Sequence, residues 1–327
     1  MVSLCGWQSC SARFLLWGAS LSVFSCYKIE VLPALFTQQF LARLETLRIR
    51  ARRQFLGSRP GGHLSPRRGA GLEFAEYRHY IPGDDPRYID WKLYSRTDKL
   101  YIKLFQEEEE LYTSVFLDLS GSMAYPVGNR KYETARDVAL ALAYVVLASN
   151  DAVKLLVLSQ AQDGQATPFF RGRQRLLDLA DFLEAHRPAG RVDPPLALAR
   201  QLQTVHRPGK AIWISDFLFP PPAMQSGLNL MRAANFDLAI IQVLGKDEMN
   251  PPLLPSGARL VDSESGESGL VRFDATAKKE YLRRLDIHNR TLRSFCHQAG
   301  IHHALVTTDQ DVQTFVLREL PALGMLT

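Results

Sequence analysis

The pattern of hydrophobic and polar positions changes its period several times along the chain, and these changes predict strands and helices in alternation. Short, nearly continuous apolar runs predict strands, whereas apolar residues spaced three and four apart predict helices. The expected strands are Leu100–Gln106, Leu111–Leu117, Ala152–Leu158, Ala211–Ser215, Asp237–Leu244 and Ile301–Val306, with a hairpin of Arg259–Asp262 and Leu270–Phe273. The expected helices are Pro33–Leu56, Lys131–Ser149, Arg173–His186, Pro195–Val205, 223–235, Ala275–Ala299 and Asp311–Leu320.

The order of these elements predicts the fold class. Strands that alternate with helices and are apolar along most of their length are typical of an open, mostly parallel sheet with helices on both faces. We therefore expect an α/β, Rossmann-like fold over residues 111–327. In such sheets the ligand site lies at the carboxyl ends of the strands. Polar residues that directly follow a strand are thus the first candidates for function.

The preceding residues divide into two further segments. Residues 1–32 form an atypical hydrophobic segment whose uncharged run, Phe14–Tyr27, has 14 residues. This is shorter than the roughly 18–20 residues that span a membrane. We interpret the segment as a start codon assigned too early, with a signal peptide as the alternative. Residues 33–110 contain a basic helix, a glycine- and proline-rich linker and a polar-aromatic stretch.

Composition and charge narrow the function classes. The chain is 46% hydrophobic and 22% charged, which is ordinary for a globular protein. The net charge of +5 is uneven, because residues 42–68 hold eight arginines and one acid, Glu45. We interpret this region as a solvated basic helix and linker; a nucleic-acid or membrane-surface binder is the alternative. Only Cys296 follows Cys26, there is no CxxC pair, and the sequence predicts a cytoplasmic protein without a zinc site.

The stretch "FLDLSGSM" carries the main chemical signal. Its apolar run ends at Asp118, and Ser120 and Ser122 follow at alternate positions around a glycine. One carboxylate and two hydroxyls suit a hard cation such as Mg²⁺, and Asp216 follows the strand "AIWIS". The alternatives are a capped polar turn and a phosphohydrolase with Asp118 as nucleophile. The second of these is disfavoured because haloacid-dehalogenase-like phosphatases carry a second aspartate where this chain has Ser120.

These motifs resemble a known family. "DLSGSM" with "ISD" 98 residues later is similar to the metal-ion-dependent adhesion site of von Willebrand factor A domains. The stretch "GLEFAEYRHYIPGDDPRYIDWKLYSRTDKLYIKLFQEEEE" resembles the signature of the bacterial domain-of-unknown-function 58 family, whose members carry such a domain. The resemblance implies that Asp118, Ser120 and Ser122 hold Mg²⁺ and that Asp216 acts through water. Val192 stands where the family has a threonine ligand, and Asp193 is the nearby candidate to replace it.

The resemblance also implies a function. Genes of this family commonly neighbour one for a MoxR-type AAA+ ATPase, so we expect a non-enzymatic adaptor that works with such an ATPase in protein maturation or complex assembly. A client or partner carboxylate would complete the Mg²⁺ shell. No specific nucleic acid is expected as a partner, and membrane association is not favoured. For "PGDDPRYIDW" we expect a structural plug that closes one sheet edge, with a docking surface as the alternative; Glu107–Glu110 would be a solvated connection.

Overall fold

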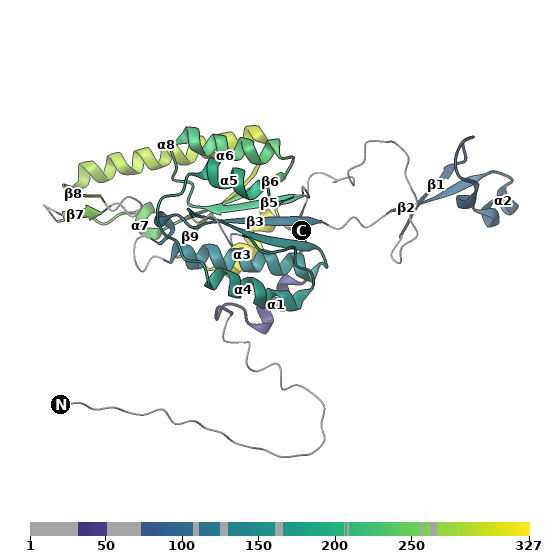
Figure 1. The fold of residues 1–327 in the computed structure, drawn as a ribbon, viewed down its shortest axis with the longest axis horizontal. Coiled ribbons are helices and arrows are strands. Elements are labelled where there is room, and N and C mark those ends of the chain that lie inside the picture. Colours follow the sequence, from purple (N-terminus) through teal and green to yellow (C-terminus); the bar gives the residue numbers. More distant parts are fainter. Residues whose placement is uncertain are drawn as a thin grey trace, which may run out of the picture.

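The centre of the protein is a five-stranded parallel sheet (Figure 1). The computed structural model describes residues 32–50, 73–106, 111–124, 130–160, 166–205, 207, 209–255, 258–261 and 267–327. The strand order is β4-β3-β5-β6-β9, and neighbouring strands are parallel throughout. Their bounds are β3 Tyr112–Asp118, β4 Ala152–Leu158, β5 Lys210–Ser215, β6 Asp237–Leu244 and β9 His302–Thr307. Antiparallel bridges from Ala166 and Phe170 lie along the edge strand β4.

Helices cover both faces of this sheet, as Figure 1 shows. One apolar cluster joins the sheet to α1 (Gln38–Leu44), α3 (Lys131–Ala148) and α4 (Leu176–Glu184). A second cluster on the other face joins it to α5 (Pro194–Leu202), α6 (Pro221–Ala233) and α8 (Ala275–Ala299). The predicted α/β, Rossmann-like fold class, an open parallel sheet with helices on both faces, is confirmed. None of the helices in the described ranges is both long enough and apolar enough to cross a membrane.

The N-terminal helix is shorter than predicted. It ends at Leu44 rather than at Leu56, and the chain then pairs with the C-terminus: Arg48 N donates to Thr327 O at 2.8 Å, and Ile49 bridges to Leu326. These tertiary contacts require an extended backbone where the apolar spacing alone predicts a helix. Phe36, Phe40 and Leu44 are buried in the same cluster as α3, so the apolar face of this basic helix is covered.

Other boundaries differ by smaller amounts. The predicted helix from Asp311 is α9 (Val312–Thr314), a π-helical turn (Phe315–Glu319) and α10 (Leu320–Ala322). The hairpin pairs β7 (Ala258–Val261) with β8 (Ser268–Val271). The short helix α7 (Lys246–Met249) directly follows β6 and was not predicted, because four residues show no periodicity.

The segment before the central sheet forms its own hairpin. Strands β1 (Glu73–His79) and β2 (Tyr101–Gln106) pair with each other, and α2 (Trp91–Thr97) lies between them in sequence. In the described residues neither strand pairs with the five-stranded sheet, so the expectation of an edge plug is wrong. Trp91 is 61% exposed, so its ring does not anchor this segment in an apolar core. Ion pairs Asp85–Arg87 and Arg78–Asp84 brace the turn instead, and Glu107–Glu110 lies outside the described residues.

Phe40→Ala tests whether the N-terminal helix is part of the central core. Phe40 is 1% exposed, so its truncation should lower the free energy of unfolding by about 3–5 kcal/mol. Gln39→Ala, an exposed change in the same helix, should have little effect. Urea denaturation measures both, and equal stabilities of the two variants would contradict the packing.

Candidate functional site

The parallel register of β3 and β5 brings the predicted site residues together. Leu117 pairs with Ile214, so Asp118 at the end of β3 and Asp216 just after the end of β5 lie at the same carboxyl edge. Strand β4 continues the sheet on the other side of β3. After β3 the chain first forms β4 on one side of β3 and later forms β5 on the other side. The strand order therefore reverses between β3 and β5, and open α/β sheets bind ligands at such a topological switch point.

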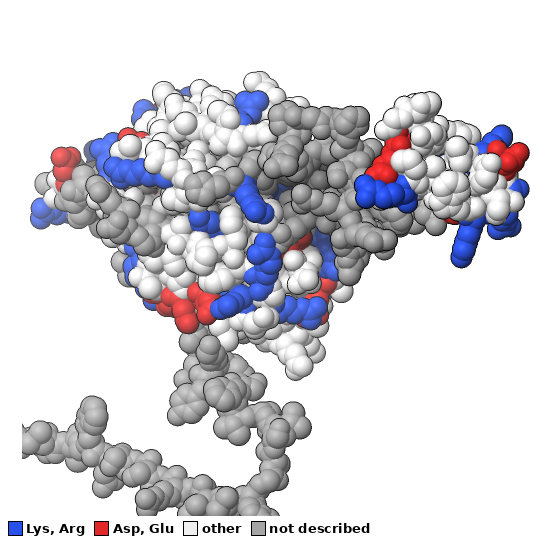
Figure 2. All heavy atoms as spheres, turned by 45° about the vertical axis from the view of Figure 1, so that its right-hand side comes forward, with Lys and Arg blue, Asp and Glu red and all other residues white. Residues whose placement is uncertain are grey.

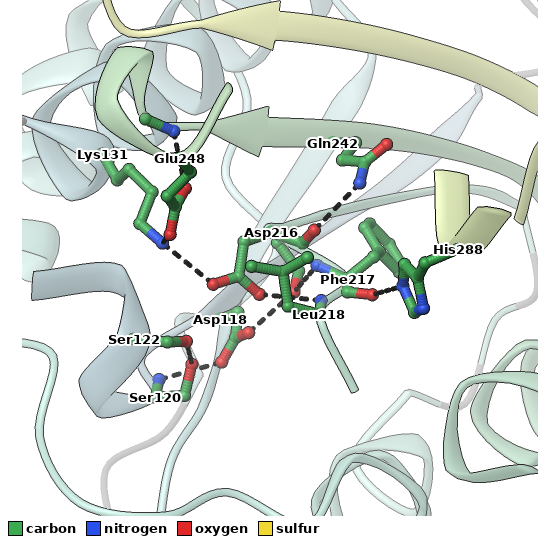
Figure 3. A network of polar contacts seen from close by, with 12 residues as sticks. Asp118, Ser120, Ser122, Lys131, Asp216, Phe217, Leu218, Gln242, Glu248 and His288 are labelled. Carbon is green, nitrogen blue, oxygen red and sulfur yellow. Dashed lines mark hydrogen bonds and ion pairs between the residues drawn. The ribbon is translucent and has the colours of Figure 1, made fainter. Parts of the chain in front are cut away.

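Asp118 is the centre of a buried hydrogen-bond network (Figure 3). Its Oδ1 accepts from Ser120 N at 2.9 Å, and its Oδ2 accepts from Ser215 Oγ at 2.7 Å. Ser120 Oγ and Ser122 Oγ are 2.9 Å apart. Burial, followed by the negative charge of Asp216, raises the pKa of Asp118 to about 7. Asp118, Ser120 and Asp216 are fully buried, whereas Ser122 is partly exposed and marks where the cluster meets the surface.

The turn after β5 holds Asp216 in place. Phe217 has a φ of 54°, a left-handed conformation that costs a bulky residue on the order of 1–3 kcal/mol. Three hydrogen bonds fix this turn: Phe217 N donates to Ser215 Oγ, Leu218 N donates to Asp216 Oδ1, and Gln242 Nε2 donates to Asp216 O. The Phe217 ring is buried 4.7 Å from the ring of Trp213, and this burial offsets the backbone strain.

Lys131 brings a positive charge into the site. Its Nζ lies 3.0 Å from Asp216 Oδ2 and 2.7 Å from Glu248 Oε1, and its side chain is fully buried (Figure 3). Lys131 is the first residue of α3, where the helix dipole disfavours a cation. Burial would also lower the pKa of Lys131, but the charges of Asp216 and Glu248 outweigh it and raise that pKa above its ordinary value. The ammonium therefore depends on these two carboxylates.

The loop that carries Val192 runs beside the site without adding a ligand. Ala189 N donates to Leu119 O, and Gly121 N donates to Gly190 O at 2.8 Å. Val192 is buried in the apolar cluster of α5 and α6. Asp193 caps α5, with its Oδ1 3.5 Å from Leu196 N. The structure thus gives Asp193 a capping role and shows no ligand at the position where the family has threonine.

The separation of the two serine oxygens fits a magnesium ion. Mg²⁺ takes octahedral oxygen ligands at about 2.1 Å, so two adjacent ligands lie about 3.0 Å apart, close to the observed Ser120–Ser122 separation. The described ranges contain no group of three or more His, Cys, Asp or Glu side chains placed to hold a metal. Two carboxylates, two hydroxyls and water would therefore have to make the shell, and Mg²⁺ commonly keeps several waters.

Three residues of the site were missed at the sequence level. Ser215 lies inside the motif "ISD", but only the structure shows its hydroxyl donating to Asp118. Glu248 lies four residues after the end of β6, so the carboxyl-edge rule could have found it. Lys131 could have been suspected as a cation in the first turn of a largely apolar helix. Its pairing with Glu248, 117 residues away, has no signal in a single sequence.

Comparison with known proteins supports the family resemblance. The model of the family described as "Protein of unknown function DUF58" matches residues 76–291. The uncharacterized protein Mb1516 of Mycobacterium bovis and the uncharacterized protein Rv1480 of Mycobacterium tuberculosis are each 29% identical over 290 residues, which is 85% of this chain and 87% of theirs. The resemblance seen in the sequence is thereby confirmed.

Solved structures give a more distant similarity. The conserved hypothetical protein BatB from Bacteroides thetaiotaomicron aligns with 15% identity and a TM-score of 0.37, over 65% of this chain and 98% of that one. An aerotolerance-related membrane protein from Bacteroides fragilis aligns with 14% identity and a TM-score of 0.38, over 65% and 97%. We draw no conclusion about this chain from either alignment.

Asp118→Asn should change the pH dependence of stability. The folded pKa of about 7 exceeds the ordinary value of 3.8, so the folded state binds more protons than the unfolded state between these values. The free energy of unfolding should therefore fall as the pH rises through this window, by on the order of 4 kcal/mol for this group. In Asp118→Asn this decrease of the unfolding free energy with pH should disappear, as measured by urea denaturation in the presence of EDTA. Asp98→Asn, at an exposed carboxylate, should keep it; parallel curves for all three proteins would contradict the prediction.

Lys131→Met should leave two buried carboxylates without their cation. We expect a loss of about 3–5 kcal/mol in the free energy of unfolding at pH 8, because each carboxylate keeps its desolvation cost. Adding Asp216→Asn and Glu248→Gln to the variant removes those charges and should restore most of the stability. Chemical denaturation of the single and triple variants measures both effects. A loss under about 1 kcal/mol in the single variant would show that the ammonium is dispensable.

Proposed function

The chain belongs to the DUF58 family of proteins of unknown function, and from its site we propose that it is a non-enzymatic adaptor with a metal-ion-dependent docking site. Asp118, Ser120 and Ser122 would hold Mg²⁺, with Asp216 acting through water. A bound Mg²⁺ supplies a coordination position that a carboxylate of a partner protein can fill. The affinity for the partner would then require both the cation and that acid.

The observation that carries this proposal is a set of exposed apolar side chains on segments that lead to or from the polar cluster. Four large apolar side chains are exposed on segments at the carboxyl edge of the sheet: Leu196 (50%), Leu218 (38%), Met249 (38%) and Leu253 (57%). Leu218 follows Asp216 by two residues, and Met249 and Leu253 follow Glu248. Exposed apolar residues gathered around a polar site favour a protein partner over a small substrate.

The charges of the site support a role for a divalent cation. Asp118, Asp216 and Glu248 contribute three negative charges when ionised, and Lys131 contributes one positive charge, which leaves a formal charge of −2. In a buried setting this excess is costly, and the charge of Asp216 adds to burial, the larger cause, in raising the pKa of Asp118. An Mg²⁺ ion would cancel it. Binding of the cation should accordingly release a proton from Asp118 below pH 7.

We propose a MoxR-type AAA+ ATPase as the partner, with a role in protein maturation or complex assembly in the cytoplasm. The resemblance to the family is the ground for this partner. Within the described residues Cys296 is buried and forms no disulfide, which agrees with a reducing compartment.

A nucleic-acid or membrane-surface binder is the less favoured alternative. Residues 51–68 of the basic region lie outside the described residues, and the apolar face of α1 is buried. On the face drawn in Figure 2, basic side chains form a run over the middle of the body, and acidic side chains lie beside its lower end. A basic stripe is the usual footprint of a binder of the phosphate backbone, but here the acidic neighbours offset part of its charge.

A phosphohydrolase that uses Asp118 is also less favoured. Both carboxylate oxygens of Asp118 accept hydrogen bonds, from Ser120 N and Ser215 Oγ. The position two residues later, where a general acid would be needed, holds Ser120. The ammonium of Lys131, which could otherwise stabilise a phosphate, is already engaged by Asp216 and Glu248.

Calorimetric titration with the candidate ATPase tests the proposal. Binding in millimolar Mg²⁺ should weaken by at least about tenfold after addition of EDTA and in Asp118→Ala, because the bridging coordination is lost. Unchanged affinity in both would remove the metal from the mechanism. Val192→Thr, which supplies the hydroxyl that this chain lacks, should tighten Mg²⁺ binding, whereas Val192→Ala should not.

A further inference from the structure

An open pocket of about 340 Å³ lies beside the proposed docking site. Gln160 contributes to its wall just after β4, Arg191 and Asp193 line it from the loop before α5, and Leu196 and Arg200 line it from α5 itself. Leu196 and Arg200 are four residues apart on the helix and so project from the same face. The pocket is therefore built from three separate parts of the chain.

Two backbone hydrogen bonds attach this pocket to the loop that carries the metal-site serines. Leu119 N donates to Leu158 O at 2.9 Å, two residues before Gln160. Gly121 N donates to Gly190 O at 2.8 Å, one residue before Arg191. Since consecutive Cα atoms are about 3.8 Å apart, the backbone of the pocket begins within roughly 10 Å of Gly121. A single short peptide segment can span that distance.

The pocket has an excess of positive charge. Arg191 and Arg200 are both exposed, and neither forms an ion pair with another described residue. Asp193 is the one acid of the wall, and it already faces the amide of Leu196 as the cap of α5. Arginine presents a planar fork of donors that matches a carboxylate, and Leu196, half exposed, adds an apolar contact.

We propose that Arg191 and Arg200 bind a second carboxylate of the partner, so that the docking surface selects an acidic segment with two acids about two to four residues apart. In an extended peptide this separation covers roughly 7–13 Å, which bridges the serine loop and the pocket. The inference rests on the proposed metal-dependent docking, because the first acid is the one that completes the metal shell. The arginine pocket adds sequence selectivity that the metal site alone does not have.

Fluorescence anisotropy with two labelled model peptides tests this pocket. One peptide carries Asp-Ala-Ala-Asp between glycines, and the other replaces the second aspartate by asparagine. In Mg²⁺ the wild-type protein should bind the two-acid peptide about tenfold more tightly. The double variant Arg191→Gln with Arg200→Gln should lose this preference. Arg232→Gln, which removes an exposed arginine of α6 outside the pocket, should retain it.

Asp193→Asn gives a test in the opposite direction. Asparagine caps helices about as well as aspartate, so the fold should be kept while the repulsion of a bound carboxylate is removed. The preference for the two-acid peptide should increase severalfold. Thermal melting of each variant confirms that these exposed changes leave the fold intact.

The outcomes separate the pocket from the metal site. Equal affinity of the wild type for both peptides, or a preference that survives in the double variant, overturns the pocket. If Asp118→Ala and EDTA weaken binding while the double variant keeps the preference for the two-acid peptide, the metal site is supported and the pocket is overturned. If the double variant loses the preference while EDTA and Asp118→Ala change nothing, the pocket is supported and the metal-dependent docking fails.

Discussion

The approach of Asp118 and Asp216 is the constraint on which the rest of the site depends. Parallel pairing of β3 with β5 places two fully buried carboxylates at one edge of the sheet, where their repulsion and desolvation both oppose folding. The protein offsets this cost locally: Ser215 donates to one carboxylate, and Lys131 is ion-paired with the other. Two buried carboxylates are destabilising if their role is purely structural, because apolar residues of similar size would fill the same edge without the desolvation cost and the repulsion.

The scaffold around these acids is rigid. Asp216 lies between a strand that is buried along its length and a left-handed residue, Phe217, and its backbone carbonyl accepts from Gln242 on the neighbouring strand. His288 of α8 is hydrogen-bonded to the carbonyl of Phe217 (Figure 3). Because three elements fix this turn, the position of the Asp216 carboxylate is set before any ligand binds, which lowers the reorganisation that binding requires.

The sequence was most informative where burial on both faces leaves a continuous apolar run. Strands β4 and β6 and the helix α8 match their predicted bounds, and the carboxyl-edge rule placed Asp118 beside Asp216. Prediction failed where distant segments decide the local structure. The backbone after Leu44 is extended because it pairs with the C-terminus, and the PGDDPRYIDW stretch belongs to a separate hairpin although an edge plug of the central sheet was expected. The ion pairs of Lys131 likewise join elements whose contact no local pattern encodes.

Two features distinguish this site from the family's metal site: Val192 replaces a threonine ligand, and Lys131 adds a buried positive charge. A site with threonine at position 192 would hold a cation more fully through the protein, whereas in the proposed site, where Val192 is buried and apolar, one coordination position would fall to water or to a partner. The ammonium of Lys131 meanwhile neutralises part of the negative charge that would otherwise attract the cation. If the proposed site binds Mg²⁺, both features would weaken binding of Mg²⁺ alone and increase the share of the affinity that a partner carboxylate supplies. Cation and partner would then bind cooperatively, each raising the affinity for the other by the same factor.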